Sequence, residues 1–484
     1  MTLSREIFDV AIIGAGPAGL SAAEYLISTG ARIVILDEQP RPGGQITRQP
    51  PKDFVVKNWL KGDLYKDLKA LLSRLEDHVD IVWKMSVSVT GITPPVSDQI
   101  DDVYQVWYQD DRAVQTVRAH KVLVAAGCYE RPLAFPGSTL PGVMGAGAIQ
   151  TFLKSQQVLV GARFVFAGTH PLQLVVAEQV LDAGGQIEAI AFAQSPLTGV
   201  SRLLRSTSLF SHWRVFLTAA RSLIRLRRAG VPLLFKHAVK QAGGVDRLEQ
   251  VTLQPVTATG APQPERPVRT FIVDRLGMSY GFQVSAELAR QAGADAVWSA
   301  DQGGWLISAN SWQESSQPGL FVAGEITGMA GAEASCLEGR IAGLGMARAL
   351  GLIPTGPADA LAARSRRQLS RQNAFAGFLN AFSRLPDDLV AHMMTPDSLV
   401  CRCENITCGA LRQALTDHPH LREANGVKLM TRTGMGLCQG RLCYSIVAEV
   451  IRRERDCSIK DIGPYHAQWP VKPLSISALL PRQK

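Results

Sequence analysis

The N-terminal segment places a glycine-rich turn between a strand and a helix, and this arrangement restricts the fold more than any other feature of the chain. A mostly apolar run from Ile7 to Ile13 ends in a turn that carries Gly14, Gly16 and Gly19, and apolar residues then recur at helical spacing. Glycines allow a tight turn and let backbone N–H groups approach a pyrophosphate at the helix N-terminus, where the helix dipole favours negative charge. The segment therefore predicts the start of a Rossmann-like dinucleotide-binding domain.

A second strand and an acidic residue strengthen this prediction. The apolar run from Ile33 to Leu36 is followed by Asp37 and Glu38. An acid about 20 residues after the last glycine is where the ribose hydroxyls of a dinucleotide are bound. Asp37 is the expected ribose contact, and Glu38 is the alternative. A glycine-rich turn also arises by chance, but here the strand, the helix and the acid all follow in the expected order.

The composition excludes several classes of protein. A chain of 484 residues should form roughly two to four domains, and a hydrophobic fraction of 46% is ample for their cores. No stretch reaches the roughly 18 uninterrupted apolar residues of a membrane span. Glycines interrupt the apolar N-terminus, so a signal peptide is not expected and the expected location is the cytoplasm.

The net charge of +9 leaves several partners open. The basic residues are dispersed rather than interleaved with aromatic residues, so nucleic acid is not an expected partner. An anionic cofactor, an acidic protein or a lipid surface fits the charge equally well. A lipid surface would place the protein at the inner face of the membrane.

Four of the eight cysteines stand in two close pairs near the end of the chain. Cys401 and Cys403 form a C-x-C pair, and Cys438 and Cys443 form a C-x4-C pair. Soft thiolate ligands gathered in this way favour an iron–sulfur cluster. Structural zinc is the main alternative, but zinc sites usually space each pair by about two to four residues, which the first pair does not match. A chain without metal is the third interpretation.

The other cysteines and the glycines of this segment have expected roles too. Gly436 and Gly440 should leave backbone N–H groups near the sulfurs. The four isolated cysteines are expected to be packed and inert, and they are Cys128, Cys336, Cys408 and Cys457.

Three motifs that arrive in the right order resemble the two-dinucleotide-binding-domain flavoprotein family. Gly43, Gly44 and Gln45 follow the second strand, Lys121 to Gly127 reads as a strand that ends in glycine, and Pro318 to Glu325 reads as a late strand and turn. The resemblance implies that the Gly-Gly-Gln lies along an FAD, or another adenine nucleotide at the same site, and that Gly127 lies beside its adenosine half. It also implies that Gly324 and Glu325 approach the ribityl or phosphate groups, with Glu325 where Asp is usual.

A second turn, after the strand that begins at Arg163, keeps only the first glycine of the dinucleotide-binding motif. Gly168 is retained, but His170 and Gln173 stand where the second and third glycines belong. No acid follows the next strand, because Ala191 occupies the equivalent position. We expect a retained fold with a weakened or changed ligand, and NAD(P)H is a doubtful one. His170 is either a base that contacts the ligand or a residue that starts the helix.

These segments predict an α/β protein with two Rossmann-like domains, one inserted in the other, and a small α-rich iron–sulfur domain. An arginine-rich helix is expected from Arg202 to Gly230, either as a solvated basic face or as a docking surface for a partner or a membrane. The breaker cluster from Pro354 to Pro357 is the expected domain boundary, followed by a helix from about Ala358 to Arg384. The expected ranges are an FAD-binding domain at 1–158 and 306–352, a degenerate dinucleotide domain at 159–305, a helical linker at 353–394 and a [2Fe-2S] domain at 395–484.

The cysteine segment from Thr431 to Cys443, together with Cys401 and Cys403, is similar to the bacterioferritin-associated-ferredoxin-like [2Fe-2S] domain. A flavoprotein followed by that domain resembles the α (or A) subunits of the opine oxidase, hydrogen cyanide synthase and hydroxyproline or proline dehydrogenase complexes. The resemblance implies a partner β subunit whose flavin oxidises the substrate, an FMN that can sit between subunits, room for a small third subunit, and an acceptor such as a quinone.

The residues themselves favour an electron relay. The chain holds no internal C-x-x-C redox pair and no persuasive acid–base pair beside a nucleotide motif. The first hypothesis is therefore an electron-transferring subunit of an amine, opine or amino-acid dehydrogenase. The alternatives are a self-contained NAD(P)H-dependent flavin reductase and, from another class, an iron-handling or scaffold protein.

Overall fold

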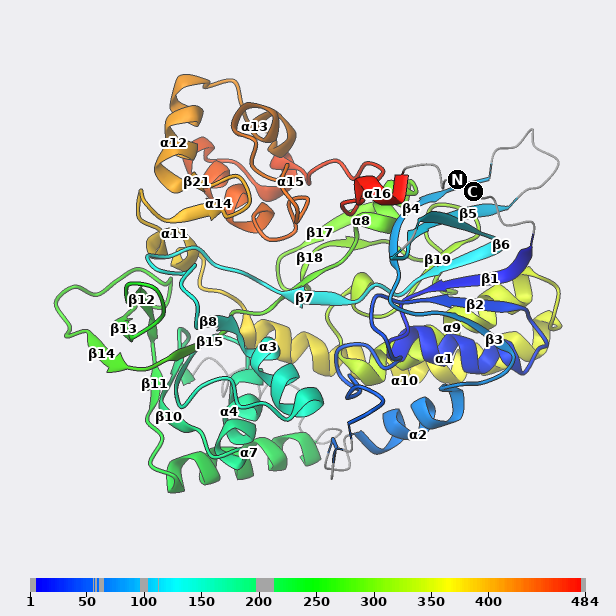
Figure 1. Cartoon of the computed structure of the whole chain (residues 1–484), viewed down its shortest axis with the longest axis horizontal. Coiled ribbons are helices and arrows are strands. Elements are labelled where there is room, and N and C mark those ends of the chain that lie inside the picture. The colour runs from blue at the N-terminus through cyan, green and yellow to red at the C-terminus, as the bar shows by residue number, and fades with distance from the viewer. Residues whose placement is uncertain are drawn as a thin grey trace. The chain divides into compact units, whose positions relative to one another are not determined.

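The computed structural model describes residues 6–54, 56, 59–60, 65–95, 103–111, 113–196 and 213–479. The chain divides into two compact units, each assembled from separated parts of the sequence (Figure 1). The first unit contains Met1–Tyr129, Gln283–Gly377 and His466–Lys484, and the second contains Glu130–Phe282 and Phe378–Tyr465. Each unit groups segments from more than one expected domain, so the domain ranges given above stay a prediction.

The first unit is built on a seven-stranded sheet with a parallel centre. Its strands are β1 (Ile7–Ile13), β2 (Ile33–Leu36), β3 (Ile81–Lys84), β4 (Ser88–Thr93), β5 (Tyr104–Gln109), β6 (Val114–Val124) and β19 (Leu320–Val322). The order is β3-β2-β1-β6-β5-β4, and β19 pairs with β6. Because β1 pairs in parallel with both β2 and β6, the glycine turn after β1 leaves the sheet at its centre. The expected strands β1 and β2 are confirmed.

Strand β6 takes part in both antiparallel and parallel strand pairing. Its first half pairs antiparallel with β5, whereas Val122 and Val124 pair in parallel with Leu320 and Val322 of β19. The late strand therefore returns to the first sheet across roughly 200 residues of intervening sequence, as a Rossmann-like domain with an insertion requires. The predicted α/β fold class is confirmed.

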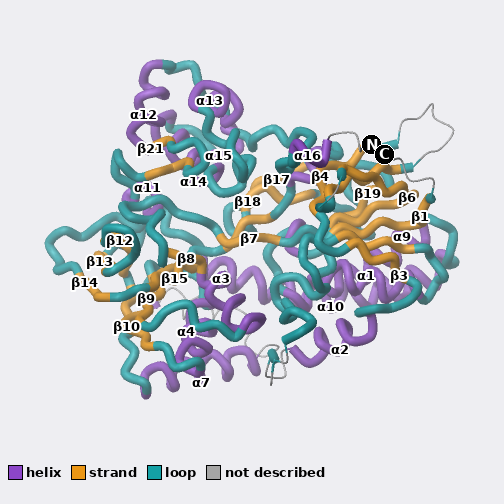
Figure 2. The backbone as a smooth tube through the Cα atoms, in the orientation of Figure 1, coloured by secondary structure: helices purple, strands orange, loops and turns teal. Residues whose placement is uncertain are grey.

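Helices α1 (Pro17–Ile27) and α9 (Ala332–Ala349) pack backbone to backbone on one side of this sheet (Figure 2). A Cβ atom at Gly339 would lie 2.0 Å from the carbonyl oxygen of Ala18, and one at Gly343 would lie 2.9 Å from that of Ala22. These two glycines therefore allow the close contact between the two helices. This contact fixes the helix that follows the glycine turn.

The remaining elements of the first unit surround this core. They are α2 (Lys66–Leu75), α8 (Glu287–Gln291), α16 (Ile476–Leu479), β17 (Ala296–Ser299), β18 (Gly304–Ile307) and the short 3-10 helix at Glu325–Thr327. Strands β7 (Cys128–Glu130) and β16 (Phe282–Val284) form a two-stranded sheet. No helix in the described ranges is both long enough and apolar enough to cross a membrane.

Helix α10 (Thr355–Ser383) begins earlier than the sequence predicted. The cluster from Pro354 to Pro357 was expected to be a boundary outside the helix, but Pro357 lies in its first turn. Proline is tolerated there because the first N–H groups of a helix have no intrahelical acceptor. The helix therefore begins at Thr355 rather than at about Ala358, and the domain boundary expected at this cluster stays a prediction.

The second unit contains a parallel sheet of the same kind. Its strands are β8 (Val143–Gly145), β9 (Arg163–Gly168), β10 (Gln186–Phe192), β11 (Leu233–Phe235) and β15 (Arg275–Ser279). The order is β11-β10-β9-β15-β8, and every neighbouring pair is parallel. Helices α3 (Ala146–Thr151), α4 (Leu172–Asp182) and α7 (Trp213–Arg228) accompany this sheet, together with a π-helical turn at Phe152–Gln156. The second Rossmann-like fold is confirmed.

The basic helix α7 is amphipathic, as expected. Leu226 is fully buried, and the Ser222 hydroxyl donates to the carboxylate of Glu178 on α4 at 2.5 Å. Arg221 and Arg228 are exposed. The part of the predicted helix before Trp213 lies outside the described residues.

A small antiparallel sheet and a helical domain complete the second unit. The sheet consists of β12 (His237–Gly243), β13 (Gln250–Pro255) and β14 (Arg269–Ile272). The helical domain contains α12 (Cys408–Asp417), α13 (Ala424–Thr431), α14 (Tyr444–Arg455) and α15 (Ile459–Ile462), with a short hairpin of β20 (Leu399–Cys401) and β21 (Ile406–Thr407). The predicted α-rich C-terminal domain is confirmed.

Helix α11 (Leu389–Met393) joins this helical domain to the second Rossmann-like fold. Leu389 and Met393 belong to the core around β9 and β10, whereas Ala391 belongs to the core of the helical domain. A Cβ atom at Gly260 would lie 2.7 Å from the Leu389 backbone. The short helix is thus buried on two sides, which holds the two folds together within this unit.

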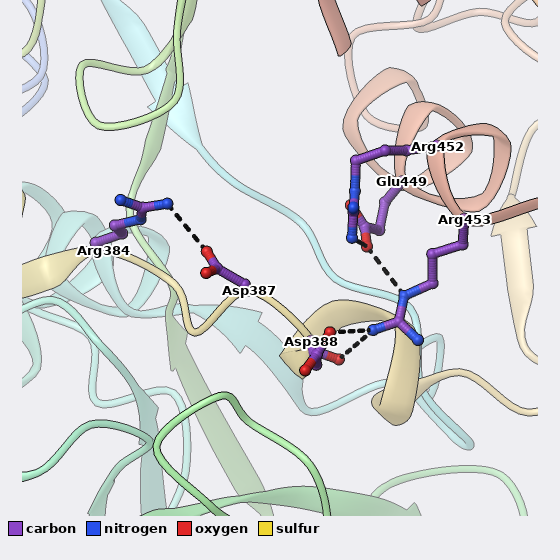
Figure 3. Close-up of polar contacts among 6 residues, drawn as sticks. All are labelled: Arg384, Asp387, Asp388, Glu449, Arg452 and Arg453. Carbon is purple, nitrogen blue, oxygen red and sulfur yellow. Dashed lines mark hydrogen bonds and ion pairs between the residues drawn. The ribbon is translucent and has the colours of Figure 1, made fainter. Parts of the chain in front are cut away.

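An ion-pair network reinforces the joint (Figure 3). The Arg453 guanidinium of α14 donates to the Asp388 carboxylate at 2.8 Å and lies 3.4 Å from Glu449, which also pairs with Arg452 at 2.8 Å. Asp388 precedes α11, and its backbone N–H donates to the carbonyl of Thr259 at 2.8 Å. The partly buried Asp388–Arg453 pair therefore connects the linker to both neighbours.

Replacing Asp388 by Asn should loosen this joint. Removing one partner of a half-buried charge pair should lower the unfolding free energy of the second unit by about 1 kcal/mol. The matched control is Asp387→Asn, because the Arg384–Asp387 pair is similar in length, 3.0 Å, but its side chains are 50% and 74% exposed. The thermal midpoint measured by calorimetry should fall for Asp388→Asn only. Equal shifts for both variants would contradict the role of the joint.

Candidate functional site

The first glycine turn is closed by contacts that tolerate no side chain. Gly14 has a φ of +105°, and a Cβ atom there would lie 2.3 Å from the carbonyl oxygen of Ala125 at the end of β6. A Cβ atom at Gly19 would lie 1.9 Å from the carbonyl oxygen of Gly14. Strand, turn and helix are therefore packed as closely as a dinucleotide fold requires.

The backbone N–H groups at the start of α1 remain available to a ligand. Among the described residues, no acceptor is found for the N–H groups of Gly16, Ala18 and Gly19, and Gly16 has no side-chain cap. The first intrahelical bond runs from Leu20 to Gly16 at 2.9 Å. These donors and the helix dipole form a site for a diphosphate, which is the group a flavin dinucleotide would place there.

The Gly43–Gly44 segment lies directly on this turn. The Gly43 N–H donates to the Ala15 carbonyl at 2.8 Å, and a Cβ atom at Gly44, where φ is +62°, would lie 2.8 Å from the Cα atom of Gly16. Gln45 is exposed. The two glycine motifs, separate in the sequence, thus form one surface of bare backbone beside the open N–H groups.

Asp37 and Glu38 differ in their surroundings. The Asp37 carboxylate accepts N–H groups from Ala15 and Gln39, both at 2.7 Å, and burial raises its pKa. Each of its oxygens can accept a further hydrogen bond, so Asp37 orders the turn and still has capacity for a ribose hydroxyl. Glu38 is half exposed, accepts the Ser88 hydroxyl at 3.0 Å and pairs with Lys472. The assignment of Asp37 as the ribose contact remains a prediction.

Arg48 is a residue of this site that the sequence analysis missed. Burial lowers the pKa of its guanidinium, and the nearby Asp37 opposes that effect. Its buried Nε has no hydrogen-bond partner among the described residues. A partly buried guanidinium with an unused donor fits an anionic cofactor. The only signal in the sequence was an arginine three residues after the Gly-Gly-Gln motif.

The end of β6 and the late glycine motif form the other side of the site. Gly127 has a φ of +69°, and its carbonyl accepts the Ser285 N–H at 3.0 Å. Gly324 has a φ of +85° and packs against α1, because a Cβ atom there would lie only 3.1 Å from the Cβ atom of Ala18. The late motif therefore adjoins the first turn of α1, as a shared cofactor site requires.

Two carboxylates, rather than one, hold the late loop. Glu325 accepts the N–H groups of Ala330 at 3.2 Å and Gly331 at 2.9 Å, ahead of α9. Glu338, which the sequence analysis missed, accepts the Gly324 N–H and the Thr327 hydroxyl, each at 2.8 Å. Burial raises the pKa of each carboxyl group to about 7. Glu325 thus orders the loop, and its predicted contact with the cofactor remains untested.

The second glycine turn uses its N–H groups internally. The N–H groups of Thr169 and His170 both donate to the Ser279 carbonyl at 2.9 Å, and Nδ1 of His170 accepts the Leu172 N–H at 3.2 Å. Burial lowers the pKa of His170 to about 4, so its imidazole is neutral. Gly168 is retained because a Cβ atom there would lie 2.0 Å from the Ser279 carbonyl oxygen. His170 therefore caps the helix, and the turn offers few free donors to a pyrophosphate.

The four paired cysteines lie together in the helical domain. Side-chain hydrogen bonds connect Cys443 to Cys401 and to Cys438, and Cys438 to Cys403. Cys401 and Cys443 are buried, Cys438 is partly buried and Cys403 is exposed. In the described part of the chain, no three His, Cys, Asp or Glu side chains are placed to hold a single metal ion. The pairwise thiol contacts fit a binuclear cluster, in which each iron takes two thiolates.

Backbone N–H groups are directed at these sulfurs. Those of Gly434 and Glu404 donate to the Cys401 sulfur, and those of Gly440 and Leu442 donate to the Cys438 sulfur. Such hydrogen bonds stabilise thiolates and tune the potential of a cluster. The expectation for Gly440 is therefore met, whereas Gly436 provides space, because a Cβ atom there would lie 2.1 Å from the Cβ atom of Cys403.

The ionisation of the thiols also suits metal binding. Hydrogen bonding with Cys443 lowers the pKa of Cys401 to about 6 and the pKa of Cys438 to about 5. The same contacts raise the pKa of Cys443. Two of the thiols are therefore thiolates at neutral pH, which is the form that binds metal.

Tyr465, which the sequence analysis did not single out, supports the cluster loop. A Cβ atom at Gly434 would lie 2.7 Å from its ring, and one at Gly440 would lie 2.4 Å from it. Tyr444 packs edge-on at 5.3 Å between ring centroids. Close packing against the ring explains why these two positions require glycine.

Comparisons with known proteins agree with both sites. Residues 8–341 match the family model of the pyridine nucleotide-disulphide oxidoreductases, and residues 399–453 match that of the BFD-like [2Fe-2S] binding domain. The second match contains all four paired cysteines.

Two relatives and one solved structure match this chain over nearly its whole length. The chain is 31% identical to the A-subunit of opine oxidase from Agrobacterium tumefaciens (strain Ach5), over 98% of this chain and 92% of that one. It is 30% identical to hydrogen cyanide synthase subunit HcnB of Pseudomonas protegens, over 97% of each chain. The crystal structure of L-proline dehydrogenase from P. horikoshii has the same fold, with a TM-score of 0.70 over 99% of this chain and 81% of that chain at 17% identity.

Gly44→Ala should weaken flavin binding by about tenfold or more, because the new Cβ atom would displace the Gly16 backbone beside the open N–H groups. Gly30→Ala is the matched control, since Gly30 also has a positive φ, +77°, but has no atom within 4 Å of a Cβ position. Flavin content and a fluorescence titration of the apoprotein would measure both. Equal flavin affinity in the two variants would contradict this site.

Cys438→Ser should abolish the cluster, because serine does not replace a soft thiolate ligand. The fully buried Cys408 is not one of the four paired cysteines, so the Cys408→Ser variant should retain the cluster. Iron and acid-labile sulfide analysis, together with visible absorption, would distinguish the two. A protein that contains zinc and no sulfide would refute the assignment.

Proposed function

The chain belongs to the pyridine nucleotide-disulphide oxidoreductase family and carries a BFD-like [2Fe-2S] binding domain, and on that basis we propose that it is the electron-transferring subunit of a multi-subunit dehydrogenase. In this proposal a partner flavoprotein β subunit oxidises an amino acid, opine or amine at a CH–NH or CH–NH2 group. The chain passes the electrons to an external acceptor such as a quinone. FMN at a subunit interface and a small third subunit belong to the same proposal.

The observation that carries the proposal is the contrast between the two nucleotide turns. The first turn leaves the N–H groups of Gly16, Ala18 and Gly19 open, whereas the second uses those of Thr169 and His170 for the Ser279 carbonyl. A flavin dinucleotide is therefore supported at the first turn, and an NAD(P)H entry site is not supported at the second. In this proposal the electrons therefore come from another chain. The relatives that match over nearly their full length are named as subunits, which supports it.

Residues of this chain would hold and tune both cofactors. The open N–H groups of α1, with Arg48 and Asp37 beside them, would bind the diphosphate and the ribose of FAD. The Cys401, Cys403, Cys438 and Cys443 thiolates would ligate the cluster, and their N–H···S bonds would adjust its potential. A flavin supplies two-electron chemistry and a [2Fe-2S] cluster supplies one-electron chemistry. The described residues of this chain provide position, hydrogen bonds and exclusion of water.

NADH and a partner-supplied donor should give opposite results. Under anaerobic conditions, NADH should leave the flavin of the isolated chain oxidised. Substrates with a CH–NH group should bleach both flavin and cluster in the complex that is co-purified from the native host. Prompt bleaching of the isolated chain by NADH would favour a self-contained reductase. A cluster that stays oxidised while the flavin is reduced would favour an iron-handling or scaffold protein.

A further inference from the structure

Exposed apolar side chains gather where the cysteine loop reaches the surface. Leu437 is 77% exposed and Leu442 is 41% exposed, and each directly precedes a cysteine of the second pair. Cys403 is itself exposed. Large apolar side chains at a loop that carries redox ligands have no role in the core of the domain. Exposed apolar residues that are grouped in this way mark interaction sites.

The same surface carries an excess of positive charge. Arg402 and Arg432 are exposed beside the cysteines, and Lys428 and Arg441 lie partly exposed nearby. The Glu404 carboxylate lies beside Gly436 of this loop, and it is already paired with Arg432 at 2.8 Å. The partly or fully exposed side chains named here are therefore a mixture of apolar and cationic groups.

Contacts within the loop hold the segments that carry these groups beside one another. Gly436, next to Leu437, lies against the Cβ atom of Cys403. Arg432 reaches the same hairpin through Glu404. The N–H group of Leu442 donates to the sulfur of Cys438, whose own N–H donates to the sulfur of Cys403. We name this surface, made of Arg402, Cys403, Arg432, Leu437 and Leu442, the cluster face.

We propose that the cluster face is the docking site for the acidic surface of a protein that exchanges electrons with this chain. The inference rests on the proposed function, because it assumes a cluster at the four cysteines. Exposed apolar side chains together with polar or charged ones are the usual composition of a protein interface. The cationic side chains select an acidic partner and speed its approach. In each encounter one electron leaves the centre of the reduced partner and enters the cluster, and no bond is formed or broken.

The test uses the holoprotein with two defined carriers of opposite charge. A plant-type [2Fe-2S] ferredoxin, which is acidic and has a low potential, is reduced, freed of excess reductant and mixed anaerobically with the oxidised protein. Cytochrome c, which is basic, is mixed in its oxidised form with the reduced protein. The rate with ferredoxin should fall about tenfold as ionic strength rises. The rate with cytochrome c should show no such decrease.

Two substitutions at one position separate charge from apolar contact. Leu437→Glu should lower the rate of electron transfer from ferredoxin about tenfold at low ionic strength, because it adds a negative charge and removes apolar area. Leu437→Lys removes the same apolar area but leaves the surface positively charged, so it should lower the rate of electron transfer from ferredoxin by less. Val245→Glu is the control, since Val245 is 84% exposed in the turn between β12 and β13 and is not part of the cluster face. Its rate should equal that of the unmodified protein.

Two results would overturn the proposal. One is a ferredoxin rate that is unchanged by Leu437→Glu and by salt, in proteins with intact iron content and visible spectra. The other is a change in oligomeric mass caused by Leu437→Glu, which would assign the face to a second copy of this chain. Neither result bears on whether the complex reduces its cluster with substrate, so the proposed function is tested separately.

Discussion

The N–H groups of Gly16, Ala18 and Gly19 have no acceptor within the described chain, and the diphosphate site proposed for the first unit depends on that. Three glycines and a close helix contact keep them open, because any side chain at Gly14 or Gly19 would meet a backbone carbonyl. The equivalent turn after β9 has the same strand and helix but directs its N–H groups to Ser279. Two turns of one architecture therefore differ in function through the destination of a few hydrogen bonds.

The cysteine loop also directs backbone N–H groups at a negatively charged group. Its N–H groups point at thiolate sulfurs instead of a phosphate, and Gly434 and Gly440 are kept free of side chains by the ring of Tyr465. A buried ring and a pair of glycines are harder to vary than a surface loop, because any added atom must displace packed atoms. The loop is thus held rigid from inside while Cys403 faces solvent.

Local patterns in the sequence predicted the strands, the turns and the cysteine pairs, because each depends on residues that are close along the chain. The strand at Ile33–Leu36 and the decayed turn at His170 were predicted in this way. Arg48 and Glu338 were missed because an isolated arginine or glutamate has no periodic signature, and its role appears only when the chain brings Asp37 or Gly324 beside it. The start of helix α10 was predicted too late because a proline in the first turn of a helix has the same local signal as a proline in a loop, and Pro357 is such a residue.

Residues 469–472 contact the sheet of the first unit. The Val471 N–H donates to the Thr90 carbonyl at 2.8 Å, a Cβ atom at Gly91 would meet the ring of Trp469, and Lys472 pairs with Glu38 at the end of β2. During synthesis on the ribosome, the contacts of the first sheet with Trp469, Val471 and Lys472 therefore form only after the whole second unit has been synthesised. The order of folding is then set by connectivity: the second unit can complete its core while the first still lacks its C-terminal strap. Glu38, which follows the predicted ribose contact Asp37, thus gains its ion-pair partner only after the second unit has been synthesised.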